Sequence, residues 1–251
     1  MHIQRIFSNA TFAMARLMNI PFFEWAKLRN KPYHLLVPAA TYAPWVTDRD
    51  FLSTYYKVRP HSLVNLYQAW ELWKMAEQLE QVPGDILEVG VWRGSTSIIM
   101  GKKLDMIGSP KTVYACDTFT GVVKAGDQED NYYAGGEHDD TSLQFVAAHV
   151  KKFGLTNVRL LQGIFPDDTG HEVADKQFSM CHIDVDAYRS GRDVLDWVWP
   201  RLAVGAVVLF NDYGFPITKG ITQLVNEENG RQGRVVIHNM NGNGIIVKTE
   251  A

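Results

Sequence analysis

Residues 85–96 read DILEVGVWRGST, an apolar run that ends in a turn with two glycines, Gly90 and Gly94. An apolar run, a glycine turn and a helical segment in this order are typical of a strand–turn–helix unit that holds a ligand at the turn. Glycine lets the backbone pass close to a ligand because it has no side chain. A helix that begins near Ser95 would offer free backbone amides to the same ligand. An ordinary tight turn would also account for the two glycines.

From residue 85 onward, short apolar runs alternate with helical patterns. We expect strands at residues 85–91, 112–116, 157–161, 178–184, 206–210, 234–238 and 244–248. Helices are expected at residues 95–105, 141–153, 188–199 and 217–229. This alternation predicts an α/β fold with a Rossmann-like, seven-stranded, mostly parallel sheet and helices on both faces. The last two runs are too close for a crossover helix, so they should form a C-terminal antiparallel hairpin.

Residues 1–62 differ from the rest of the chain because five prolines fall within them. This density predicts short helices joined by irregular segments. The apolar residues 1–23 predict an amphipathic helix that packs on the protein body or on a neighbouring subunit, with a membrane-surface anchor as the alternative. No apolar window reaches the roughly 18–20 residues of a membrane span.

We therefore expect an N-terminal helical or irregular extension over residues 1–62, for oligomer contacts or as a lid. The domain that carries the chemistry should cover residues 63–251 and open with a long helix over residues 63–81.

The composition narrows the class of protein. The chain has 251 residues and a formal net charge of −3, which argues against a nucleic-acid binder with its strongly basic surface. Its two cysteines, Cys116 and Cys181, are too few for a disulfide scaffold and lie in apolar runs. We expect buried thiols and a cytoplasmic location.

The ends of the first three strands predict the ligand. Glu88 stands two residues before Gly90, where a carboxylate would repel a pyrophosphate and suit a cationic ligand such as S-adenosylmethionine. Asp117 ends the second strand, where an acid is placed to accept hydrogen bonds from ribose hydroxyls, although a solvent-facing strand end is the alternative. The neighbours expected to complete the cofactor site, around the adenine and the strand ends, are Thr118, Phe119, Gln162, Gly163, Phe165 and Asp184.

Acidic and amide side chains follow the fourth and fifth strands. Asp184 and Asp186 end the fourth strand, and Asn211 and Asp212 end the fifth. These strand ends should meet at the carboxyl edge of the sheet, beside the cofactor. Carboxylate and amide oxygens are ligands that Mg²⁺ prefers. We assign Asp184, Asn211 and Asp212 to a metal and Asp186 to the general base that deprotonates a hydroxyl, with a cluster that binds metal only in part as the alternative.

Residues 118–140 show no clean period and follow the second strand. A structureless connection of this length in a compact domain is usually a lid or a disordered stretch. We expect it to be a mobile cover over the site.

These motifs resemble the macrocin O-methyltransferase family. The resemblance begins near Trp45 and is carried by LEVGVWRGSTS, CDTFTG, QGIFPDD, HIDVDAY and WPRLAVGAVVLFNDYG. It implies an S-adenosylmethionine- and magnesium-dependent enzyme that methylates a sugar hydroxyl of a small-molecule glycoside, as in antibiotic biosynthesis. It also implies a homo-oligomer whose N-terminal segments contact neighbouring subunits. By analogy, Asp184 would be a metal ligand and Asp186 the general base.

One position departs from the family pattern. The family has two adjacent acids before the tyrosine, whereas this chain has Asn211 and Asp212. An amide oxygen still coordinates a cation, but with one negative charge less, which predicts a weaker affinity for metal.

Two other classes of function remain open. Asp184-Val185-Asp186 is a D-x-D motif, which in metal-dependent glycosyltransferases binds a metal and a nucleotide-sugar diphosphate. That interpretation leaves the glycine turn and Asp117 unexplained. The second alternative is a non-catalytic module that binds S-adenosylmethionine without transferring its methyl group. A nicotinamide enzyme is disfavoured because the three-glycine fingerprint is absent.

Overall fold

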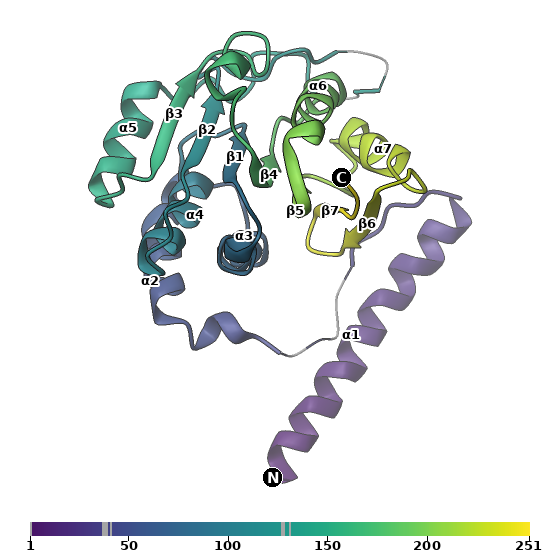
Figure 1. Ribbon diagram of the computed structural model, residues 1–251. Coiled ribbons are helices and arrows are strands. Elements are labelled where there is room, and N and C mark those ends of the chain that lie inside the picture. The colour runs from purple at the N-terminus through teal and green to yellow at the C-terminus, as the bar shows by residue number, and fades with distance from the viewer. Residues whose placement is uncertain (1, 37–39, 41, 127–128, 131) are drawn as a thin grey trace. The chain divides into compact units, whose positions relative to one another are not determined.

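A computed structural model of the chain describes residues 2–36, 40, 42–126, 129–130 and 132–251. Contacts between residues divide the chain into two compact units, Met1–Pro44 and Trp45–Ala251. The second unit carries the whole sheet (Figure 1). Residues 45–62, which we grouped with the N-terminal extension, belong to this second unit. The expected roles of residues 1–62 in oligomer contacts or as a lid stay predictions.

The first unit consists mainly of one helix, α1 (His2–Leu28), with Pro21 inside it. The helix expected over residues 1–23 is therefore confirmed, whereas the short helices expected from the prolines are wrong for this segment. A proline removes a single backbone donor, and its fixed φ is itself helical, so a helix can continue past it at a cost in stability. Large apolar side chains on α1 are exposed, among them Leu17, Phe23 and Trp25. Among the described residues, no helix has the length and apolar character to cross a membrane.

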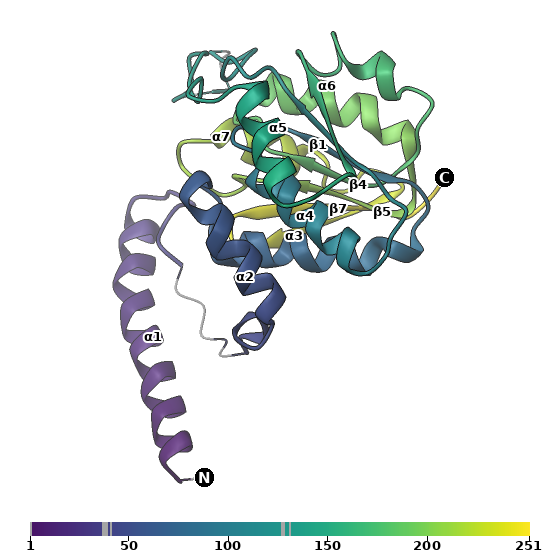
Figure 2. The ribbon, with the colours of Figure 1, turned by 90° about the vertical axis from the view of Figure 1, so that its left-hand side faces the viewer.

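The second unit is built on a seven-stranded sheet with the order β3-β2-β1-β4-β5-β7-β6 (Figures 1 and 2). The five parallel strands are β1 (Asp85–Val89), β2 (Val113–Asp117), β3 (Val158–Gln162), β4 (Phe178–Ile183) and β5 (Leu202–Phe210). The strands β6 (Arg234–Asn239) and β7 (Asn243–Lys248) form the antiparallel hairpin, and β7 pairs with β5. The predicted fold class is confirmed.

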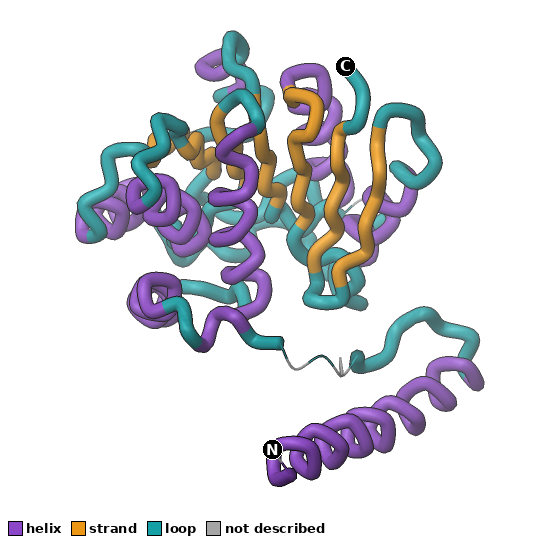
Figure 3. Tube along the Cα trace, turned by 60° about the horizontal axis from the view of Figure 1, so that its bottom comes forward, coloured by secondary structure: helices purple, strands orange, loops and turns teal. Residues whose placement is uncertain are grey.

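Six helices accompany the sheet in this unit. They are α2 (Arg49–Val58), α3 (Leu66–Gln78), α4 (Ser95–Met106), α5 (Leu143–Lys152), α6 (Tyr188–Val198) and α7 (Lys219–Glu227). Short 3-10 turns lie at Pro44–Val46, Arg59–His61, Leu79–Gln81, Gly170–Val173 and Trp199–Arg201. Figure 3 shows the strands side by side with helices around them. The expected helix over residues 63–81 starts later, at Leu66, because the Asn65 side chain caps its first turn.

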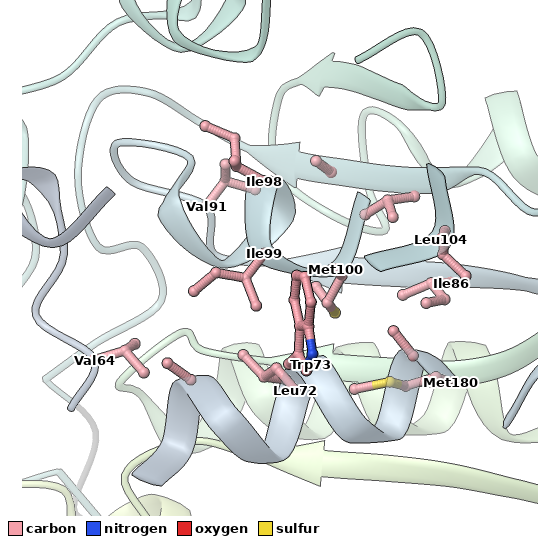
Figure 4. Close-up of a cluster of buried hydrophobic side chains, with 14 of the residues drawn as sticks. Val64, Leu72, Trp73, Ile86, Val91, Ile98, Ile99, Met100, Leu104 and Met180 are labelled. Carbon is pink, nitrogen blue, oxygen red and sulfur yellow. The ribbon is translucent and has the colours of Figure 1, made fainter. Parts of the chain in front are cut away.

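The sheet separates two apolar cores because side chains alternate along each strand. On β1, Ile86 belongs to one core and Leu87 to the other. The first core lies under α2, α3, α4 and α5, with the fully buried Trp73 of α3 near its centre (Figure 4). The second lies under α6 and α7. Both cysteines are buried and free, as predicted.

The turn after β1 passes unusually close to the end of β4. Gly90 has a φ of +89°, and a Cβ atom built on it would lie 1.8 Å from the Asp184 carbonyl oxygen. The Asp184 amide donates to the Val89 carbonyl oxygen at 2.9 Å, which holds the two strand ends together. Only glycine fits at residue 90, because any side chain would collide with the backbone of β4.

We therefore expect Gly90→Ala to unfold the protein, or to lower its free energy of unfolding by more than about 3 kcal/mol. Gly108→Ala is the matched control. Gly108 also has a positive φ, +68°, but a Cβ there would meet no atom within 4 Å. The control should lose only the roughly 1–2 kcal/mol of left-handed backbone strain. Urea denaturation followed by circular dichroism measures both, and equal losses would contradict the steric explanation.

Candidate active site

A cavity of about 470 Å³ opens at the carboxyl edge of the parallel strands. All of its lining residues belong to the second unit. Ten of the fourteen residues predicted from the sequence line it: Gly90, Ser95, Asp117, Thr118, Gly163, Phe165, Asp184, Asp186, Asn211 and Asp212. The glycine turn and the acidic strand ends therefore share one cavity, and its volume suits a small molecule.

Asp117 fastens the end of β2 to the glycine turn. One carboxylate oxygen accepts hydrogen bonds from the backbone amides of Val91, at 2.6 Å, and Trp92, at 2.8 Å. The other oxygen accepts from the Phe119 amide at 2.6 Å. An ionised carboxylate offers roughly four acceptor positions, so Asp117 keeps capacity for a hydroxyl group in the cavity that it lines.

The structure does not bring four of the predicted cofactor residues to the cavity wall: Glu88, Gly94, Phe119 and Gln162. Glu88 is fully buried, accepts a hydrogen bond from the Ser97 hydroxyl and lies 2.9 Å from Nδ1 of His182. Burial acts to lower the pKa of His182, but the hydrogen bond and charge of Glu88 outweigh it, so the pKa is raised. Glu88 thus joins α4, β1 and β4 under the site. Its assignment to the cofactor stays a prediction without a contact to support it.

Three acids and one amide gather where β4 and β5 end. The Asn211 side-chain amide donates to Oδ1 of Asp184 at 2.9 Å. Asp186 and Asp212 both have left-handed backbone, with φ of 62° and 63°. Acidic residues tolerate this conformation better than most, although it still costs about 1 kcal/mol or more.

The electrostatics of this cluster favour a bound cation. Burial, with the charge of Asp186 adding to it, raises the pKa of Asp184 to about 6, although His182 opposes the change. Burial and the charges of Asp184 and Asp186 likewise raise the pKa of Asp212 well above its usual range. Like charges held this close in low dielectric disfavour ionisation until a cation joins them. A bound cation would therefore supply the positive charge that lets these carboxyls ionise together.

The donor chemistry of the cluster fits a hard divalent cation. Carboxylate oxygens are the ligands that Mg²⁺ prefers. Nevertheless, no three His, Cys, Asp or Glu side chains within the described residues converge as a ready metal-holding group. Asn211 presents its side-chain nitrogen to Asp184, and its assignment to the metal stays a prediction at this point. The carboxylates of Asp184 and Asp212 are the groups that could hold a metal.

The segment 118–140 also contributes residues to the cavity wall. The residues of it that the structure describes contain no helix or strand, as expected. Backbone hydrogen bonds tie its two halves together, because the Val122 amide donates to the Glu137 carbonyl oxygen at 2.8 Å. His138 lines the cavity, with Nε2 3.9 Å from an Asp186 carboxylate oxygen, and the Tyr133 hydroxyl lies 3.5 Å from the same nitrogen. That this segment is a mobile cover stays a prediction.

Sequence reasoning missed part of the cavity wall. Val64, Asn65 and Gln68 enter it from the start of α3, and Tyr133 from the segment 118–140. One signal was available: Asn65 and Gln68 form the capping box of α3, and an Asn-x-x-Gln pattern ahead of an apolar run is readable from the sequence. Nothing in the sequence places the start of that helix beside the end of β5.

A parallel sheet with a terminal antiparallel hairpin, a glycine turn, an acid at the end of β2 and a cavity at the carboxyl edge define an S-adenosylmethionine-dependent methyltransferase. The family model described as macrocin O-methyltransferase (TylF) matches residues 61–239. The chain belongs to this family and is an S-adenosylmethionine-dependent O-methyltransferase.

Named relatives agree with this assignment. The chain is 30% identical over 201 residues to the 8-demethyl-8-(2,3-dimethoxy-alpha-L-rhamnosyl)-tetracenomycin-C 4'-O-methyltransferase of Streptomyces olivaceus, covering 76% of this chain and 74% of the relative. It is 31% identical over 193 residues to the mycinamicin III 3''-O-methyltransferase of Micromonospora griseorubida, covering 71% and 74%. Among solved structures, the O-methyltransferase NovP superposes with a TM-score of 0.65 at 25% identity, covering 76% of this chain and 83% of NovP.

The raised pKa of Asp184 predicts how stability depends on pH. Because its folded value of about 6 lies above the ordinary 3.8, the folded state loses stability as pH rises through this window. In metal-free buffer, we expect Asp184→Asn to be more stable than the wild type at pH 8, by up to about 3 kcal/mol. The difference should shrink by more than half at pH 4.5. Urea denaturation at several pH values measures the free energy of unfolding of the variant and the wild type. A difference between them that does not change with pH would contradict the raised pKa of Asp184.

Proposed function

We propose that this enzyme transfers the methyl group of S-adenosylmethionine to a sugar hydroxyl of a glycosylated small molecule. The observation that carries the proposal is the single cavity that joins the glycine turn and Asp117 to the acid cluster. The cofactor would lie along Gly90, Asp117 and Phe165, and the acceptor hydroxyl beside Asp186. The names of the two relatives support a sugar acceptor, since one acts on a rhamnosyl-tetracenomycin and the other on mycinamicin III.

The chemistry asks little of the protein beyond position and proton removal. The sulfonium of the cofactor already activates the methyl group, so alignment of the hydroxyl oxygen with it supplies much of the rate. Asp186 lines the cavity and would accept the hydroxyl proton as general base. His138, 3.9 Å from Asp186, would stabilise the position of that carboxylate.

We further propose that a divalent cation such as Mg²⁺ belongs at the acid cluster. Its charge would lower the pKa of a coordinated hydroxyl. Asp184 and Asp212 would hold it, because burial and the neighbouring acids raise the pKa of both carboxyls, and a cation would offset that repulsion. Homo-oligomerisation and a cytoplasmic location remain predictions from the sequence, and light scattering of the purified chain tests the first.

The alternatives differ in what they bind. A metal-dependent glycosyltransferase would use Asp184 and Asp186 for a nucleotide sugar, but the chain belongs to a family of O-methyltransferases. A non-catalytic module would bind S-adenosylmethionine without turning it over. Binding and turnover therefore need separate measurements.

The cofactor site is tested by calorimetric titration of S-adenosylmethionine against the wild type and Asp117→Ala. Removing a carboxylate that accepts from the ribose hydroxyls and holds the glycine turn should weaken binding about 100-fold or more. Asp175→Ala, at an exposed surface position, is the control and should bind like the wild type. Unchanged affinity in Asp117→Ala would remove Asp117 from the site.

The catalytic assignment is tested by Asp186→Asn. This change keeps the shape of the side chain but removes the proton acceptor, so kcat with a glycoside acceptor should fall by about 10²–10⁴. Affinity for S-adenosylmethionine should stay within about twofold, because Asp186 is not assigned to cofactor binding. Methyl transfer is followed by mass spectrometry of the acceptor. A variant that keeps more than about a tenth of the wild-type kcat would exclude Asp186 as the base.

A further inference from the structure

A chain of side-chain amides runs from the start of α3 to the acid cluster, and its first link has a fixed direction. Oδ1 of Asn65 accepts from the backbone amides of Tyr67 and Gln68, at 2.9 and 3.1 Å. Backbone amides can only donate, so this atom of Asn65 must be the oxygen. The Asn65 Nδ2 group then donates to Oε1 of Gln68 at 2.7 Å, and the Asn65 backbone amide donates to the same oxygen at 3.2 Å.

The orientation of Gln68 follows from these donors. Because its oxygen is held by Asn65, its Nε2 group faces the other way, toward the residue after β5 and the first residue of β7. Nε2 donates to Oδ1 of Asn211 at 2.6 Å and to Oδ1 of Asn243 at 3.2 Å. The two hydrogens of this amide therefore have one acceptor each, and Gln68 is only 4% exposed.

A second anchor fixes the same orientation independently. The Glu71 carboxylate, which can only accept when ionised, receives hydrogen bonds from Nδ2 of Asn243 at 2.5 Å and of Asn241 at 3.0 Å, and one from Nδ2 of Asn239. With its nitrogen on Glu71, Asn243 must turn its oxygen to Gln68. The two anchors agree on the direction of every amide between them.

The last link decides what Asn211 offers to the acid cluster. Its oxygen accepts from Gln68, so its nitrogen points at Asp184 and donates to Oδ1 at 2.9 Å. Turning the amide over would set oxygen against a carboxylate oxygen and nitrogen against the Gln68 nitrogen. Asn211 is 8% exposed, so turning its amide over would replace two largely buried hydrogen bonds by two repulsive contacts.

We infer that Asn211 is a positioning residue that orients the Asp184 carboxylate, held in this role by Gln68, and that it is not a ligand of the cation. The sequence-based assignment of Asn211 to the metal is thereby replaced. The inference rests on the proposed function only in taking the acid cluster as a cation site. Asp184 and Asp212 hold a cation at this cluster. A water molecule occupies the coordination position that the sequence-based assignment gave to Asn211.

The test counts the water molecules on bound Mn²⁺, from the broadening of its electron paramagnetic resonance lines in ¹⁷O-enriched water. The full-length wild type is compared with Asn211→Ala, Asp212→Ala and Asn211→Asp. We expect the same water count in Asn211→Ala as in the wild type, because no ligand is lost. Asp212→Ala should carry one more water. Asn211→Asp should carry one fewer and bind Mn²⁺ about tenfold more tightly, because a carboxylate oxygen replaces the nitrogen.

One more water on Mn²⁺ in Asn211→Ala, as in Asp212→Ala, would overturn the inference. So would an unchanged water count in Asn211→Asp, or a wild type that does not bind Mn²⁺. Should a variant fail to fold, the remaining ones still decide, since each has its own expected count: unchanged in Asn211→Ala, one more water in Asp212→Ala and one fewer in Asn211→Asp. The Mn²⁺ experiment is done without S-adenosylmethionine and without an acceptor. Failure of this inference is therefore separable from failure of the proposed methyl transfer, which the Asp117 and Asp186 variants test.

Discussion

The site depends on one close approach of two backbones, Gly90 of the turn after β1 against the Asp184 carbonyl of β4. Adjacent parallel strands bring their carboxyl ends to one edge of the sheet, but they do not by themselves make those ends touch. Here the absence of a side chain at residue 90 lets the cofactor turn lie directly against the first acid of the cluster. In the proposed function, a methyl donor at the turn would be adjacent to a hydroxyl at the acids. Packing of the main chain would then set the distance between donor and acceptor.

Beneath this edge, a buried contact between a carboxylate and an imidazole joins the same two strands. Glu88 on β1 and His182 on β4 lie opposite each other in the sheet register, and Ser97 of α4 joins them. Sequence reasoning assigned Glu88 to the cofactor because it precedes the glycines, an assignment that stays a prediction, whereas the structure buries it away from the cavity wall. Side-chain alternation explains the difference: Glu88 shares the strand face of Ile86, which packs under the helices and not at the strand end. An acid inside a strand and an acid after it have different surroundings, as Glu88 and Asp184 illustrate.

The predictable parts of this enzyme are those encoded in contiguous residues. Apolar runs and helical spacing located the seven strands, their mostly parallel arrangement and the terminal hairpin, and the motifs at the strand ends located ten residues of the cavity wall. The prolines misled for α1, because Pro21 is tolerated inside a long helix. The hydrogen bonds of Gln68 to Asn211 and Asn243 could not be predicted from the sequence, since they depend on α3 lying beside the ends of β5 and β7. The direction of the Asn211 amide was equally hidden, because it follows from partners 143 residues away along the chain.

The amide chain links segments that are synthesised far apart in time. Gln68 precedes the sheet, whereas Asn243, which takes its second hydrogen, comes 175 residues later in the final hairpin. Contacts of such long sequence separation form late, since the closure entropy of the intervening chain must first be offset by the rest of the fold. On the ribosome, the second hydrogen of the Gln68 amide therefore stays without its acceptor until β7 has emerged and paired with β5. The Asn65 anchor is in place long before the Asn243 anchor, so the network of amides is completed in two stages.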